Sequence, residues 1–92
     1  MIIYCEINLW LPVVYSLKDK RSIIKSLQEK LKNKFNVAVA ELAQNDLWKN
    51  STIGIVSVSA NKRFLEQLIN KIISFIDEFT GVEISNYTSK YY

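Results

Sequence analysis

The chain has 92 residues, of which 49% are hydrophobic and 23% charged, and its net charge is +3. This composition predicts a single globular domain over residues 1–92 and excludes a disordered chain, which would be poorer in apolar side chains. The apolar runs are far shorter than the roughly 20 residues that cross a bilayer, and one cysteine cannot form an internal disulfide. We therefore expect a cytoplasmic protein without membrane contacts, in which a free thiol is ordinary.

Residues 2–11 alternate between two faces, as in a strand with one buried side. The side chains of the predicted core face are Ile3, Cys5, Ile7, Leu9 and Leu11. The opposite face carries Tyr4 and Trp10, together with polar residues. Pro12 cannot donate to a strand ladder, so we expect the strand to end there.

Ser16 is well placed to cap a helix that begins at Leu17 and continues until residues 33–36 break the pattern. Its apolar stripe at helical spacing consists of Leu17, Ile24, Leu27, Leu31 and Phe35. Seven basic residues and two acidic ones lie between residues 18 and 34, so this segment carries +5 and leaves −2 for the rest of the chain. Four of these cations line up about 100° around the axis from the apolar stripe: Lys18, Arg21, Lys25 and Lys32.

The remaining elements follow from the same two periodicities. Residues 37–42 and 52–59 are typical of strands joined by the polar turn at residues 44–46. Ser59 or Asn61 can cap a second helix, which ends at Gly81 and is followed by a fourth strand over residues 82–87. The order βαββαβ predicts an α+β, ferredoxin-like fold: a four-stranded antiparallel sheet with two helices on one face.

Three blocks in the same order carry a family resemblance: residues 16–21 (SLKDKR), 34–41 (KFNVAVAE) and 46–48 (DLW). Over most of its length the chain resembles the YlxP-like family of small bacterial proteins. The resemblance implies a ferredoxin-like fold. Because members tend to be encoded beside translation and ribosome-maturation factors, it also implies a role around RNA or ribosomes, although the family's biochemical activity is not established.

Successive elements of a βαββαβ unit alternate in direction, so the start of the first helix and the hairpin between the second and third strands share one end. A positively charged corner near a helix N-terminus attracts phosphate, and a nearby tryptophan can stack on a base. We therefore predict a surface that binds structured RNA or ribosomal particles. Its predicted residues are Lys18, Lys20, Arg21, Lys25, Lys32, Trp48 and Lys49.

Structural explanations of the same residues remain open. Lysines on the polar face of a helix are often only a solvated surface. An ion-pair network of Lys20, Arg21, Glu41 and Asp46 would fix the hairpin instead of binding a ligand. Trp48 would then pack over the open end of the core.

The outer face of the predicted sheet offers a second kind of surface. Tyr4, Trp10 and Tyr87 are expected to point away from the helices, and an uncovered apolar surface usually has a partner. The alternatives are a homodimer or protein interface formed by Tyr4 and Trp10, an aromatic platform for RNA, and coverage by residues 87–92. Because the third strand lacks the aromatic-rich pattern of RNA-recognition motifs, the sequence favours dimerisation over the platform.

No pattern in the sequence supports catalysis. The chain has no histidine, which removes the commonest general base and metal ligand, and only two glycines, too few for a phosphate-binding loop. Cys5 falls on the core face without an activating partner nearby in the sequence, so we expect it to serve packing. We therefore expect a protein that is not an enzyme and uses no cofactor and no metal.

Overall fold

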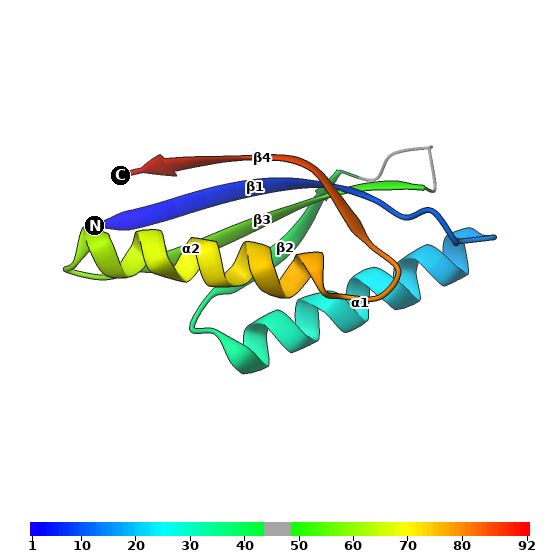
Figure 1. The fold of residues 1–92 in the computed structure, drawn as a ribbon, viewed down its shortest axis with the longest axis horizontal. Coiled ribbons are helices and arrows are strands. Elements are labelled where there is room, and N and C mark those ends of the chain that lie inside the picture. The colour runs from blue at the N-terminus through cyan, green and yellow to red at the C-terminus, as the bar shows by residue number, and fades with distance from the viewer. Residues whose placement is uncertain (44–48) are drawn as a thin grey trace.

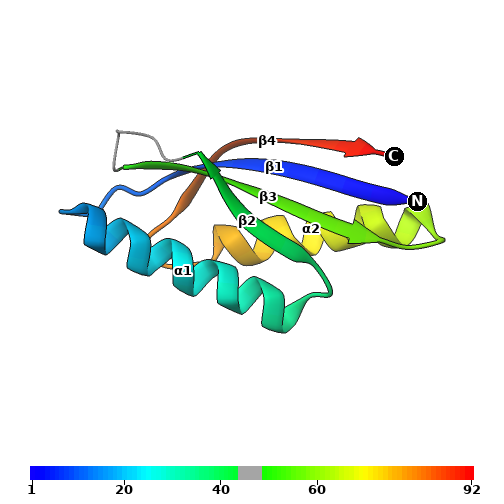
Figure 2. The same cartoon turned by 180° about the vertical axis from the view of Figure 1, so that it is seen from behind.

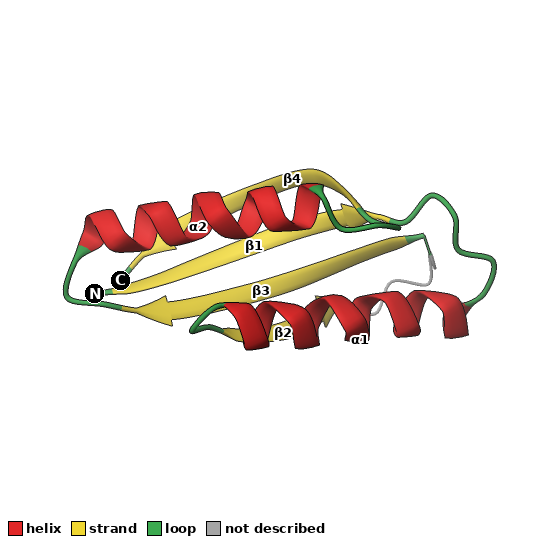
Figure 3. Cartoon of the chain, turned by 60° about the horizontal axis from the view of Figure 1, so that its bottom comes forward, coloured by secondary structure: helices red, strands yellow, loops and turns green. Residues whose placement is uncertain are grey.

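Strands and helices follow one another in the order β1, α1, β2, β3, α2, β4 in the computed structural model, which describes residues 1–43 and 49–92 (Figure 1). Their bounds are β1 Ile2–Trp10, α1 Leu17–Lys34, β2 Ala38–Ala43, β3 Asn50–Val58, α2 Lys62–Asp77 and β4 Glu83–Tyr91. The strands form one antiparallel sheet in the order β2-β3-β1-β4. Both helices lie on the same face of this sheet (Figure 3). The predicted ferredoxin-like fold is thus confirmed.

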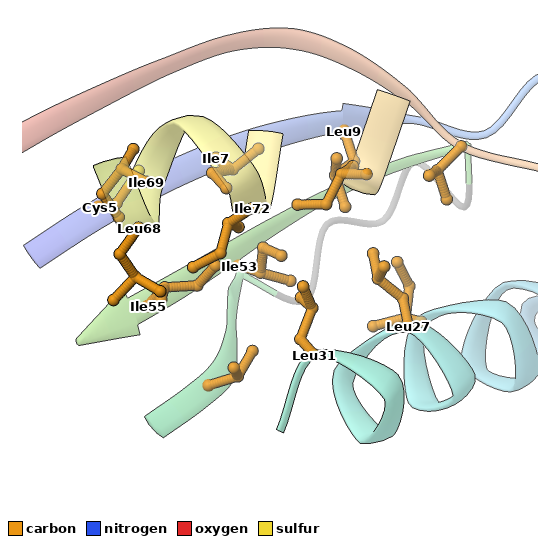
Figure 4. Close-up of a cluster of buried hydrophobic side chains, with 14 of the residues drawn as sticks. Cys5, Ile7, Leu9, Leu27, Leu31, Ile53, Ile55, Leu68, Ile69 and Ile72 are labelled. Carbon is orange, nitrogen blue, oxygen red and sulfur yellow. The ribbon is translucent and has the colours of Figure 1, made fainter. Parts of the chain in front are cut away.

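The alternation along β1 places its side chains as the sequence predicts. The odd-numbered residues of β1 are buried and the even-numbered ones between Tyr4 and Asn8 are half-buried. The buried side chains meet those of β3 and of both helices in a single core (Figure 4). Its labelled members are Cys5, Ile7, Leu9, Leu27, Leu31, Ile53, Ile55, Leu68, Ile69 and Ile72. This core fixes the position of each helix relative to the sheet.

Of the two candidate N-caps of helix α2, Ser59 and Asn61, the second one caps the helix. The Asn61 side-chain oxygen accepts a hydrogen bond from the Phe64 N–H (3.2 Å), and Ser59 Oγ accepts one from the Asn61 N–H (3.1 Å). Asn61 is therefore the N-cap, and Ser59 supports it. At the other end Gly81 has φ +98°, a left-handed conformation that L side chains rarely adopt, and so permits the turn into β4.

The C-terminal segment differs from its prediction. Residues 87–92 were expected to form a tail beyond the fourth strand, but β4 continues to Tyr91 along the edge of β1, and Tyr92 also pairs with Ile2 (N–H to O distances of 2.8 and 2.9 Å). The expectation that Tyr87 points away from the helices was also wrong. Tyr87 lies opposite Ile7 in the ladder, and directly opposed residues share a face, so Tyr87 is on the helix side of the sheet.

The molecule is elongated, with extents of 42 × 21 × 18 Å. The end of β1, the start of α1, the end of β2 and the start of β3 all lie toward one end of the long axis (Figures 1 and 2). The alternating directions of the elements produce this grouping, as the topology predicts. This end carries most of the residues that the sequence assigns to the nucleic-acid surface.

Candidate nucleic-acid interface

The first turn of α1 is fixed by reciprocal capping. Ser16 Oγ accepts a hydrogen bond from the Asp19 N–H (3.1 Å), and the Asp19 carboxylate accepts one from the Tyr15 N–H (3.1 Å). The first bond satisfies a backbone donor that the helix itself leaves unpaired, and the second holds the residue before the N-cap against the first turn. The Asp19 carboxylate is therefore committed to the turn.

Four of the predicted cations form an exposed row along α1. Lys18, Arg21, Lys25 and Lys32 are all exposed, and their spacing of three, four and seven residues keeps them on one side of the helix. We call these four residues the basic row. Over 14 residues of helix the row extends about 21 Å, enough to meet several phosphates in succession.

The burial of Lys20 does not fit its predicted place on the RNA-binding surface. Only 5% of its surface is exposed, so its ammonium group has little surface to offer a phosphate, and Lys20 does not belong to the basic row. A sequence signal for this burial exists, because Lys20 precedes Ile24 by four residues and Leu27 by seven and so falls on the buried stripe of α1. Leu17, which was assigned to that stripe, is instead 49% exposed.

The ion-pair network predicted for Lys20, Arg21, Glu41 and Asp46 stays a prediction. Lys20 is buried, and Glu41 is half-buried and accepts a hydrogen bond from the Ser51 hydroxyl. Arg21 is exposed, however, and Asp46 lies outside the described residues. Burial therefore separates Lys20 from Arg21, which the sequence had placed together.

At the hairpin end, Lys49 is tied to the end of β1. Its carbonyl oxygen accepts a hydrogen bond from the Leu11 N–H (2.8 Å), and its Nζ lies 5.8 Å from the ring centroid of Trp10. This cation–π contact joins a residue predicted for RNA binding to one predicted for the protein interface. Trp48 lies outside the described residues.

The outer face of the sheet has a polar middle and an apolar end. The Tyr4 hydroxyl donates a hydrogen bond to Glu6 (2.8 Å), and this bond is the main reason why the pKa of Tyr4 is raised. Asn8 accepts a hydrogen bond from the Thr52 hydroxyl and donates one to Asn86 (both 2.6 Å). A carboxylate beside Tyr4 repels phosphate, so this face is better suited to a protein than to an RNA platform.

Cys5 has the environment expected of a packing residue. It is fully buried, and burial raises the pKa of its thiol, opposed by a weaker hydrogen-bond contribution from Ser89. A raised pKa lowers the fraction of reactive thiolate. Within residues 1–43 and 49–92, no three histidine, cysteine, aspartate or glutamate side chains are grouped to hold a metal ion. No helix of the described segments has the length and hydropathy to cross a membrane.

Sequence reasoning missed a second set of cations, which lies between the two helices. Lys30 and Lys34 project from α1 on the side of α2, away from the basic row, and line a groove with Lys71 and Phe75 of α2. Phe35, Phe75 and Phe79 are only half-buried there. The signal in the sequence was Phe35 at the end of the first apolar stripe, together with Phe75 and Phe79 on the second.

The fold and these surfaces define a small ferredoxin-like α+β protein with an exposed basic helix. The family described as "Protein of unknown function (DUF503)" matches residues 2–89, so the chain belongs to this family. It is 35% identical over 68 residues to the "Uncharacterized protein YlxP" of Bacillus subtilis (strain 168), covering 74% of each chain. The resemblance to the YlxP-like family is confirmed.

Solved structures support the same fold at low sequence identity. The structure of protein YJCS superposes with a TM-score of 0.66 at 10% identity, covering 100% of this chain and 99% of the other. The designed protein LFR1 1 with ferredoxin fold gives a TM-score of 0.57 at 11% identity, covering 98% and 81%. Such similarities show a shared fold and carry no statement about function.

Proposed function

We propose that this protein is a non-enzymatic cytoplasmic module that binds structured RNA through the basic row of α1. The observation that carries the proposal is the alignment of four exposed cations, Lys18, Arg21, Lys25 and Lys32, on one side of a rigid helix. Lys49 extends the surface at the hairpin end, and Trp48 is proposed to stack on a base there.

The chemistry of the basic row favours phosphate over base recognition. Lysine and arginine contacts to phosphates give affinity and position the protein, whereas sequence is read through base edges. The basic row consists of lysine and arginine side chains and contains no amide or carboxylate group that would read base edges. Ribosomal RNA is the first RNA to test, because the family resemblance points toward translation and ribosome maturation.

The proposal predicts a steep dependence of RNA affinity on salt. Four phosphate contacts correspond to a slope of about −3 to −4 in log K against log salt, so affinity should fall by about fiftyfold or more between about 50 and 200 mM KCl. Fluorescence anisotropy of a labelled RNA hairpin measures this slope. Affinity that changes little over this range would contradict binding through the basic row.

A second candidate function is homodimerisation through the outer face of the sheet. The specific observation is a group of exposed apolar side chains near Tyr4, away from the polar middle of this face: Ile2, Val56 and Val58. Trp10 is exposed at the other end of β1. A surface of this kind commonly lies in a contact between copies of a chain.

Sedimentation equilibrium tests the dimer. At micromolar concentration the protein is expected to have about twice its monomer mass of 10.7 kDa. The Val56→Glu and Val58→Glu double variant should return it to a monomer, whereas Val13→Glu, an exposed valine outside the sheet, should leave the dimer intact. A monomeric parent protein would remove this candidate.

A further inference from the structure

A groove runs between the second half of α1 and the second half of α2, which lie side by side on the helix face of the sheet (Figure 3). It has a volume of about 400 Å³ and is lined by residues of both helices and the turn after α1. The charged residues that line it are Lys34, Lys71 and Glu78, and Lys30 joins them where the groove continues past Phe79. The rim thus carries three positive charges and one negative charge.

Aromatic rings form the floor of this groove. The Phe35 and Phe75 rings are 6.0 Å apart at 80°, and the Phe75 and Phe79 rings are 6.4 Å apart at 50°. Each ring is only half-buried, so part of each ring stays open to solvent between the helices. A strip of exposed apolar surface bordered by charged residues is typical of a binding groove.

The arrangement of the lysines argues against a nucleotide in the groove. Lys34 Nζ lies 5.0 Å from the Phe75 ring centroid and 5.9 Å from that of Phe35, and Lys30 Nζ lies 5.2 Å from that of Phe79. These ammonium groups already occupy faces of the rings on which a base would stack. Glu78 in the same groove would also repel a phosphate.

The groove is long enough for a helix. At the other end of α2, Phe64 is 50% exposed and lines an adjoining hollow with Phe35 and Lys71. Phe64, Lys71 and Phe75 are spaced by seven and four residues, so they share one side of α2, and Phe79 follows two residues after the end of the helix. From Phe64 to the end of α2 at Asp77 the helix rises about 20 Å, the length of a partner helix of about 13 residues, and Phe79 lies just beyond it.

We propose that the groove between α1 and α2 binds an amphipathic helix of a partner protein, with an apolar stripe on the phenylalanine floor and acidic side chains toward Lys30, Lys34 and Lys71. Charge complementarity selects an acidic partner, and the extended apolar floor selects a helix, which presents side chains at every third or fourth residue. This site is separate from the basic row and does not depend on RNA binding.

A designed peptide tests the proposal. The probe has about 15 residues, with leucine at every third or fourth position, glutamate on both flanks and alanine or glutamine elsewhere. Titration into the ¹⁵N-labelled 92-residue chain is expected to give saturable amide shifts confined to the groove, including those of Phe35, Phe75 and Phe79. A second peptide with lysine in place of each glutamate should give no saturable shift, because it meets the three lysines.

Charge-reversal variants locate the binding. Lys30→Glu combined with Lys34→Glu should weaken binding of the acidic peptide by at least about tenfold, since both cations face the flank of the partner helix. Arg63→Glu combined with Lys90→Glu makes the same change in net charge at exposed cations outside the groove and should leave affinity within about twofold. All four substitutions are at exposed positions, so the variants are expected to remain folded.

Three results would overturn the proposal: no saturable shift with the acidic peptide, shifts centred on the outer face of the sheet, or an equal loss in both double variants. Competition between the peptide and an RNA hairpin also shows which of the two occupies the groove. If an RNA hairpin shifts the same groove residues and displaces the peptide, then the groove belongs to RNA. If the hairpin instead shifts residues of the basic row and leaves the peptide bound, the two sites are independent and the proposal stands.

Discussion

Reversal of Lys18, Arg21 and Lys25 to glutamate is expected to weaken binding to an RNA hairpin by about a hundredfold or more at low salt, because each lost attraction becomes a repulsion. The three residues are exposed and share one side of α1. The slope of log K against log salt should become shallower by about one for each phosphate contact removed. Fluorescence anisotropy at several salt concentrations gives both quantities, and circular dichroism checks that the helices persist.

A matched triple variant tests whether RNA binding depends on the position of the cations or only on the net charge of the protein. Lys62→Glu, Arg63→Glu and Lys90→Glu produce the same change in net charge at exposed positions outside α1. RNA affinity of this variant should stay much closer to that of the parent protein, and its salt slope should be unchanged. Equal losses in the two triple variants would mean that RNA responds to overall charge, and the basic row would lose its assigned role.

Lys20 provides a second control for the same surface. Because Lys20 is buried, Lys20→Met should leave RNA affinity within about twofold of the parent value, even though it removes a cation from the same helix. A large loss of affinity, with stability unchanged, would restore Lys20 to the RNA-binding surface.

Leu27→Ala is expected to lower the free energy of unfolding by about 2–5 kcal/mol, a large part of the total for a domain of this size. Leu27 is 0% exposed in the middle of α1 and joins the core that also includes Ile53 and Ile72. Truncation removes buried apolar surface and leaves a cavity between the helix and the sheet. The midpoint and slope of urea unfolding measure the change.

Leu17→Ala is the matched control, since it makes the same chemical change in the same helix. Leu17 is 49% exposed, so its truncation should cost less than about 1 kcal/mol. If both variants lose the same stability, the side chain of Leu27 does not hold α1 on the sheet as the structure indicates. A selective loss in Leu27→Ala would support the placement of the helix that displays the basic row.

The element order and most of the core could be predicted without coordinates, because side-chain periodicity is a local property of the chain. The period of two in β1 identifies the buried face that Ile7 and Leu9 share, and the period of 3.6 in α1 identifies Ile24, Leu27 and Leu31. The same helical period separates the basic row from the core. The exposed cations of the candidate surface could therefore be predicted without coordinates.

The faces of β4 required the tertiary structure. Ile84 lies opposite Leu9 and Tyr87 opposite Ile7, so two residues three positions apart share the helix side of the sheet. Strict alternation from Ile84 would put Tyr87 on the outer face. The register shift between Asn8 and Leu9 in the β1–β4 pairing inserts one residue and reverses every face beyond it, and only the pairing with β1 reveals this shift.

The burial of Lys20 and the groove between the helices were likewise decided by packing. The helical period puts Lys20 on the apolar stripe of α1, and the packing of this helix against the sheet removes its side chain from solvent. Lys34 and Phe75 are 41 residues apart in the numbering, yet the Lys34 ammonium lies 5.0 Å from the Phe75 ring. Local periodicity assigns each residue to a face of its own helix, but the angle and separation of two helices depend on the sheet beneath both.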